Sequence, residues 1–118
     1  MPDNASALLV ALPDRRRRIA EVLAPQGVEV TGEAAGPETA LRLLDERAPA
    51  LLVVELGAET DDPDVLLRNE LLLEFVGDAR DRVEGLRVIA VAESGNSGLA
   101  ADALTHGVDA YVVVPDAR

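Results

Sequence analysis

The residue best placed to do chemistry in this sequence is Glu55, a carboxylate near the end of the apolar run 50–56. A run of this kind, entered from a proline and left through a glycine, is typical of a strand buried on both faces of a parallel sheet. In open α/β sheets the functional crevice lies outside the carboxyl ends of the strands. Glu55 is therefore a site candidate because of its position, and its chemistry depends on the side chains around it.

Few other residues could complete a reactive site around Glu55. Asp14 follows an earlier apolar run, and Ser94 lies in the polar stretch 93–98. His106 is the only histidine, and its place just before Gly107 favours a cation near a helix C-terminus. Because the chain has neither a second histidine nor a serine elbow, we find no nucleophile–base pair, and because it has no cysteine, we find no thiolate metal site. The sequence predicts a protein that is not an enzyme, with no catalytic residue, metal or cofactor.

The elements that position these residues alternate between strand and helix. Apolar or alternating runs predict the strands, and amphipathic spacing after a proline or an aspartate predicts the helices. The expected strands are 7–12, 28–31 at a sheet edge, 50–56, 87–92 and 108–114, and the expected helices are 14–23, 37–48, 63–84 and 99–105. Short connections indicate right-handed crossovers and a parallel sheet. At the helix starts, Asp14 is expected to cap free amide groups with its side chain, and Asp62 before Pro63 is a similar entry.

The length and the charge restrict the class of protein. The 118 residues fit one domain, 1–118, and 22 acidic against 11 basic residues give a net charge of −11. Such a charge repels phosphate backbones and anionic membranes, so we expect protein partners and no nucleic-acid or membrane binding. The arginine run 15–18 is better explained as a solvated face that pairs with local acids than as an anion site. The sequence has neither a membrane-spanning apolar run nor a basic signal start, which predicts a cytoplasmic protein.

The order of these elements and two motifs together resemble the receiver domain of bacterial response regulators. Residues 49–56 are similar to the strand "P-D-L-V-L-L-D-L" of that family, and residues 107–115 are similar to its motif "G-A-D-D-Y-L-x-K-P". The resemblance covers nearly the whole chain. It implies a three-layer flavodoxin-like α/β fold with a five-stranded parallel sheet of order 2-1-3-4-5. It also implies a place in two-component signalling, which in this family normally uses Mg²⁺-dependent phosphorylation of an aspartate.

By the same resemblance, the acidic half of the phosphorylation pocket is degenerate in this chain. The acidic pair after the first strand matches Leu12 and Pro13, with only Asp14 beside them. The phosphoacceptor position holds Glu55, whose extra methylene displaces the carboxylate. Since Mg²⁺ is held by carboxylates and phosphate oxygens, phosphorylation of Glu55 is not expected. Glu55 is then either a permanent negative charge that holds one conformation or a solvated carboxylate at a strand end.

The other half of the pocket is degenerate as well. The hydroxyl position of the family is Ala92, with Ser94 two residues later. The lysine position is Val114, in a chain whose 11 basic residues are all arginine. Of the lysine–proline pair that ends the motif only Pro115 remains, and Tyr111 occupies the position of the aromatic switch residue. The resemblance therefore implies a pseudo-receiver with a degenerate phosphorylation pocket.

Two surfaces are candidates for contact with a partner. Leu67, Leu71 and Phe75 add a second apolar row to the helix 63–84, which is either an interaction surface or part of the protein's own core. Receivers end with a fifth helix, which is missing or truncated here, so apolar surface on the first, third and fifth strands is expected to be exposed. A homodimer partner, a swapped element or another protein is expected to cover it.

The sequence thus predicts a phosphorylation-independent, receiver-like signalling or scaffolding module that acts through protein–protein interaction. The alternative is a small-molecule or nucleotide-binding α/β regulatory domain that uses the crevice near Asp14, Glu55 and Ser94. Specific binding of such a ligand would stabilise the folded protein, whereas an interaction module would not respond.

Overall fold

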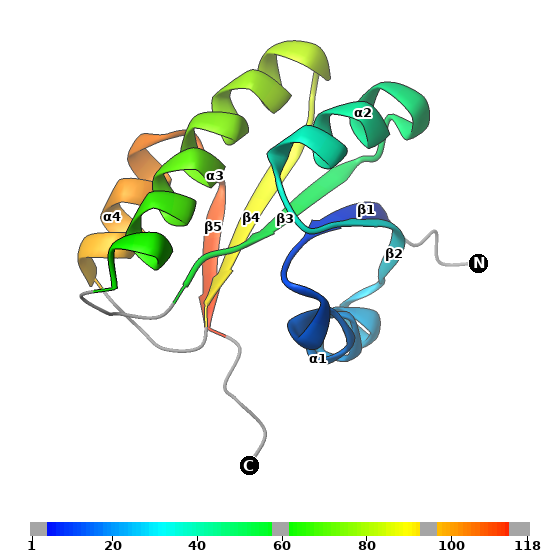
Figure 1. Cartoon of the computed structure of the whole chain (residues 1–118). Helices are drawn as coiled ribbons and strands as arrows, with labels where there is room; N and C mark the ends of the chain where they lie inside the picture. Colours follow the sequence, from blue (N-terminus) through cyan, green and yellow to red (C-terminus); the bar gives the residue numbers. More distant parts are fainter. Residues whose placement is uncertain (1–4, 58–61, 93–96, 114–118) are drawn as a thin grey trace.

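The first strand lies inside the sheet and the second lies at its edge, because the parallel strands are ordered β2-β1-β3-β4-β5 (Figure 1). The computed structural model describes residues 5–57, 62–92 and 97–113. The strands are β1 (Ala5–Val10), β2 (Val28–Ala34), β3 (Leu51–Glu55), β4 (Arg87–Ala92) and β5 (Ala110–Val113). The helices are α1 (Pro13–Leu23), η1 (Ala24–Gln26, a 3₁₀ turn), α2 (Pro37–Arg47), α3 (Pro63–Arg82) and α4 (Ser97–Thr105). This confirms the expected fold class, strand order and number of helices between the strands.

Two apolar layers sandwich the sheet. Leu8 and Val54 face α2, α3 and α4, whereas Leu9 and Val53 face α1 on the opposite side (Figure 1). All four side chains are buried, because successive residues of a strand point to opposite faces and both faces are covered here. This explains why the inner strands are apolar at nearly every position. No helix among the described residues is long and apolar enough to cross a membrane.

The starts of two helices differ in their capping. Helix α3 begins at Pro63, as expected, and the side chain of Asp62 before it accepts a 2.9 Å hydrogen bond from the Asp64 N–H. At α1 the capping position is Leu12, which makes no side-chain cap bond, and Asp14 lies exposed inside the first turn. The expected side-chain cap at Asp14 is therefore wrong, because Pro13 already begins the helix one residue earlier.

The second apolar row of α3 divides between the core and the surface. Phe75 is 2% exposed and belongs to the core, so its assignment to an interaction surface is wrong. Leu67 and Leu71 are 54% and 48% exposed. Ala48, the last residue of the expected helix 37–48, lies just outside α2 and is exposed, because the helix ends at Arg47. Of the second apolar row of α3, only the C-terminal member, Phe75, is thus buried.

The α1 side of the sheet is better covered than the sequence predicts. Leu9 on β1 and Val53 on β3 are fully buried together with Ile19 of α1, so their expected exposure is wrong. Exposure remains at β5, where Val112 pairs with Val91 and is 37% exposed. Helix α1 therefore accounts for coverage near β1 and β3 but leaves the β5 end of this face open to solvent.

Candidate functional site

Glu55 is the last residue of β3, and its carboxylate reaches the loop that leads from β1 into α1. Its Oε1 accepts a 3.3 Å hydrogen bond from the Leu12 N–H, and its Oε2 lies 3.8 Å from Nε of Arg15. The side chain of Glu55 is only 12% exposed. Glu55 is therefore a largely buried carboxylate held against the start of α1, and its description as a solvated strand-end group is wrong.

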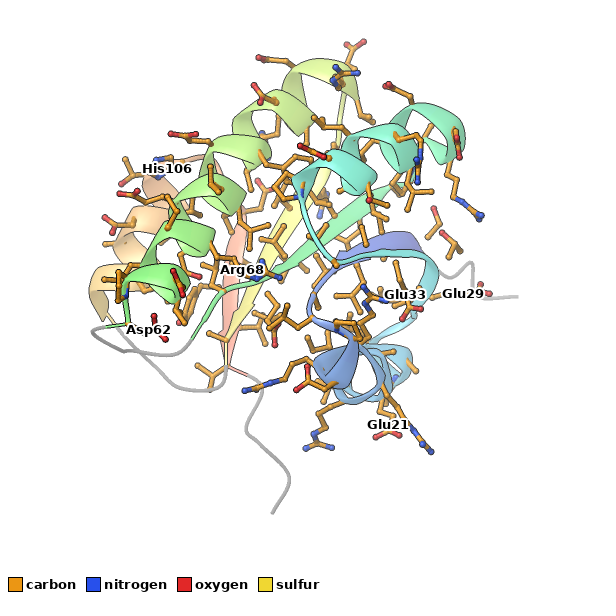
Figure 2. The ribbon with its side chains drawn as sticks, in the orientation of Figure 1. Glu21, Glu29, Glu33, Asp62, Arg68 and His106 are labelled. Carbon is orange, nitrogen blue, oxygen red and sulfur yellow. The ribbon has the colours of Figure 1, made fainter. Side chains whose placement is uncertain are left out.

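A second arginine approaches the carboxylate from α3. Arg68 extends from α3 toward the strands (Figure 2), where its Nη2 donates a 3.2 Å hydrogen bond to the carbonyl oxygen of Ala35. Its charge attracts that of Glu55. Three segments far apart in the sequence, the first turn of α1, the end of β3 and the first half of α3, thus meet around one carboxylate.

Burial dominates the electrostatics of this cluster. It raises the pKa of the Glu55 carboxyl above 4.5, while the Leu12 hydrogen bond and the charges of Arg15 and Arg68 lower it and the charge of Asp14 raises it. Burial likewise lowers the pKa of the Arg68 guanidinium, and the charge of Glu55 opposes this change. The two arginines therefore offset only part of the cost of burying the carboxylate.

The residues around Glu55 do not fit a Mg²⁺ site of the kind that the receiver resemblance implies. Leu12 and Pro13 place exposed apolar groups in the loop after β1, and two guanidinium groups stand near the carboxylate. Within residues 5–57, 62–92 and 97–113, no three His, Cys, Asp or Glu side chains gather to hold a metal. Two of the charged neighbours of Glu55 are therefore cations, whereas Mg²⁺ requires oxygen ligands.

The remaining positions of the degenerate pocket are only partly described. Ala92 ends β4 and is buried, with a methyl group in place of the hydroxyl of the family. Tyr111 on β5 is half-buried against the core on the α3 and α4 side, and burial raises the pKa of its phenol. Ser94, Val114 and Pro115 lie outside the described residues. Their expected places in the pocket remain predictions.

The histidine lies away from Glu55. His106 follows the end of α4, and its Nδ1 is 2.7 Å from the carbonyl oxygen of Asp102 in the same helix (Figure 2). Because α4 starts at the carboxyl end of β4 and runs back along the sheet, its end lies at the edge opposite Glu55. This position agrees with a residue at a helix C-terminus rather than a partner of the carboxylate.

Arg68 and Asn69 are residues that the sequence reasoning missed. The Asn69 side chain is 6% exposed, and its Oδ1 accepts a 2.7 Å hydrogen bond from the Gly57 N–H just after β3. Arg68 precedes the buried Leu72 by four residues, which places it beside the buried stripe of α3. This spacing of four residues from Leu72 was the sequence signal that could have identified Arg68. Arg15 was read as part of a solvated run, although it points to Glu55.

Comparison with solved structures identifies the fold. The chain is similar to the signal receiver domain of the response regulator NarL from Mycobacterium tuberculosis, with 16% identity and a TM-score of 0.71 over 98% of this chain and 88% of that one. It is also similar to a LuxR-family response regulator from Aurantimonas sp. SI85-9A1, with 24% identity and a TM-score of 0.72 over 94% and 74%. NtrX from Brucella abortus, solved in complex with ATP, gives 23% identity and a TM-score of 0.73 over 97% of this chain and 24% of that one. No family model and no curated protein matches the sequence.

Proposed function

We propose that this chain, which has the fold of a response-regulator receiver domain, is a pseudo-receiver that works by protein–protein contact without phosphorylation. The fold supports a signalling module. The observation that carries the proposal is the setting of Glu55, a buried carboxylate held by the Leu12 N–H and flanked by Arg15 and Arg68. These cations belong to the protein itself, so the carboxylate is partly neutralised at all times.

The chemistry of phosphoryl transfer supports this proposal. A metal ion can coordinate the attacking oxygen and the phosphoryl oxygens at once, and it neutralises charge as the reaction proceeds. A guanidinium can donate hydrogen bonds to such oxygens but cannot take the place of the metal ion that bridges them, and Arg15 and Arg68 are already engaged with Glu55 and with the Ala35 carbonyl. The methyl group of Ala92 also cannot donate a hydrogen bond to a phosphoryl oxygen. Glu55 is accordingly proposed to be a fixed structural charge that joins β3 to α1, and the protein is proposed to be no enzyme.

Contact with a protein is supported by the surface of α3. Leu66, Leu67 and Leu71 are each about half exposed along its first half. Leu12, which lies next to Glu55 in the loop after β1, is 44% exposed. Clustered exposed leucines on a soluble domain mark contact surfaces. We propose the cytoplasm as its location, with no nucleic acid or membrane as partner because of the net charge of −11.

Intact-mass spectrometry after incubation with acetyl phosphate and Mg²⁺ tests independence from phosphorylation. The wild-type chain is expected to gain no phosphoryl mass, while a receiver domain with a complete pocket gains it under the same conditions. The variant Glu55→Asp restores the usual nucleophile and is also expected to gain none, because the metal ligands are still lacking. A phosphoryl group on residue 55 of the wild-type chain would disprove the proposed function.

A thermal-shift screen with nucleotides, Mg²⁺ and acetyl phosphate tests the alternative ligand-binding function. A ligand that binds the folded protein raises its melting temperature by an amount that grows with the logarithm of ligand concentration above its Kd, so a rise that depends on concentration in this way would favour the alternative. A flat response is expected. Light scattering over a concentration series then distinguishes contact with a second copy of the chain from contact with another protein.

A further inference from the structure

A groove runs between the start of α2 and the part of α3 from Asp64 to Asp78. One hollow of about 500 Å³ is lined mainly by residues 36–41 and by α3 from Leu71 to Asp78. A second hollow of about 330 Å³ extends it toward Leu12 and Asp64. Both include Gly36, Pro37 and Leu71, so they form one surface, here called the α2–α3 groove. The two helices that wall it lie side by side (Figure 1).

The groove has an apolar floor. Leu67 and Leu71 of α3 are about half exposed within it, and the buried Phe75 of the core continues the same row. Pro37 and the half-buried Leu41 line the α2 side. A row at intervals of four residues on one helix provides a ridge against which a second helix can pack. The floor thus offers the geometry of a helix–helix contact with its outer helix missing.

The rim of the groove is acidic. Glu38, Asp64, Glu74 and Asp78 line it, on a chain whose net charge is −11. Arg68 is the basic residue among the lining side chains of these two hollows, and its guanidinium is bonded to the Ala35 carbonyl and attracted by Glu55. The potential at the groove is therefore negative, which favours a cationic partner and opposes a second copy of this acidic chain.

We propose that the α2–α3 groove binds a cationic amphipathic helix, with an apolar face on Leu67 and Leu71 and lysine or arginine side chains against the acidic rim. This inference rests on the proposed function, because it specifies the partner of the interaction module. Apolar anchors at i, i+3, i+4 and i+7 of such a helix match the ridge of α3. From Asp64 to Asp78 the groove extends for about 21 Å, the length of about 14 helical residues.

Three synthetic peptides of about 14 residues test this proposal by fluorescence anisotropy. The first has leucines on one helical face and lysines elsewhere, the second has the same composition in scrambled order, and the third has glutamate in place of lysine. Saturable binding of the first peptide, weakened by salt and at least tenfold tighter than that of either other peptide, is expected. No saturation at millimolar peptide, or equal binding of the scrambled peptide, would overturn the proposal.

Variants of the full chain locate the binding surface. Leu71→Glu is expected to weaken binding of the first peptide at least tenfold, although it adds negative charge that would attract a cation. Leu104→Glu, at a leucine of α4 that is 54% exposed, is the matched control and should change affinity less than twofold. Both positions are about half exposed, and circular dichroism verifies that both variants fold. Equal losses in the two variants would overturn the location of the site.

A charge pair tests the rim separately. Glu74→Gln with Asp78→Asn should weaken binding severalfold and reduce its salt dependence, whereas Glu70→Gln with Asp81→Asn removes the same charge from positions outside the groove lining. Equal effects of the two pairs would show nonspecific attraction and overturn the proposal. All titrations omit Mg²⁺ and acetyl phosphate. A failure of the peptide to bind the groove would therefore not change the outcome of the phosphorylation test. Phosphorylation of the wild-type chain would likewise not change how peptide binding is interpreted.

Discussion

The Gly57 N–H donates a 2.7 Å hydrogen bond to Oδ1 of Asn69, which joins the end of β3 to the middle of α3. Gly57 follows Glu55 by two residues, and Asn69 follows Arg68 directly. The bond therefore holds together the two segments that bring Glu55 and Arg68 near each other. Because Asn69 is buried, loss of this bond would leave its Oδ1 atom with no water molecule to replace the Gly57 N–H. An unsatisfied buried acceptor of this kind destabilises the folded protein.

Replacing Gly57 with alanine should destabilise the protein by about 1–3 kcal/mol, because its Cβ would collide with the Val65 side chain. Urea unfolding measures the change. The matched control is Gly77→Ala, at an exposed position of α3 where a Cβ would meet no atom within 4 Å. It should stabilise the helix by about 0.5–1 kcal/mol. Equal stability of the Gly57→Ala variant and the wild type would contradict the close packing at this turn.

The variant Glu55→Gln should be at least as stable as the wild type at neutral pH. The folded-state pKa of Glu55 is raised above the usual 4.5, so the folded protein binds the proton more tightly than the unfolded chain does. The contribution of Glu55 to the free energy of unfolding of the wild type therefore falls as pH rises from 4.5 through the raised pKa. Glutamine does not titrate, so its contribution stays constant over this range. Urea unfolding across this range should show the advantage of the variant shrinking toward pH 4.5. A less stable variant at neutral pH would mean that attraction by Arg15 and Arg68 exceeds the cost of burial.

Replacing Asp109 with asparagine should have the opposite pH dependence. Oδ2 of Asp109 accepts hydrogen bonds from the Val88 N–H at 2.8 Å and from Arg80 at 3.0 Å. The Val88 bond, followed by Arg80, holds the pKa of this carboxyl below 3.8, so its stabilisation is present above 3.8 and is lost as pH falls through the lowered pKa. The loss in the variant should be at most about 1 kcal/mol at neutral pH, because the side chain is 47% exposed.

Chemical denaturation at several pH values measures this difference, which should vanish in acid. Asp45→Asn is the matched control, since Asp45 forms an exposed ion pair with Arg82 and accepts no hydrogen bond from the backbone of the described residues. Its effect should be smaller at every pH. A loss that persists below the lowered pKa of Asp109 would show that the charge of this carboxylate is not what stabilises the fold.

Replacing Ala48 with glycine should stabilise the protein by up to about 1 kcal/mol, as judged by its melting temperature. Ala48 caps α2 with φ 41° and ψ 59°, a left-handed conformation in which its Cβ is crowded. The flexibility of glycine in the unfolded chain offsets part of this gain. Ala101→Gly, at an exposed position inside α4, should instead cost about 1 kcal/mol. A loss at both positions would contradict the strain assigned to Ala48.

The sequence was sufficient to predict the alternation of elements, and the receiver resemblance added the strand order. Burial within α3 was harder to predict. Leu67, Leu71 and Phe75 share one spacing, yet only Phe75 is buried, because α2 and the sheet cover just the C-terminal part of that row. The same limit applies to the α1 face, where the coverage of Leu9 and Val53 depends on how α1 lies across the sheet.

The candidate site was predicted at the right carboxylate but with incomplete neighbours. Strand periodicity located Glu55, whereas its contacts with Arg15 and Arg68 depend on the crossing of segments distant in the sequence. Charged residues are usually solvated, so a run of arginines gives no sign that one of them points inward. Asp14 shows a related limit. Asp14 is a typical capping residue and Pro13 is a typical first helical residue, and the sequence did not show which of the two begins the helix.

The two edges of the sheet differ in a way that affects aggregation. Along β2 the exposed positions are Glu29, Thr31 and Glu33, so this edge strand carries two negative charges. The described part of β5, at the other edge, exposes Val112 and Val113, which are uncharged and β-branched. Charge at an edge strand repels the strand of another molecule, whereas valine favours its addition. The charge at β2 therefore opposes fibril-like growth, whereas β5 permits it. The single substitution Val113→Lys should keep concentrated samples soluble by adding charge at the β5 edge.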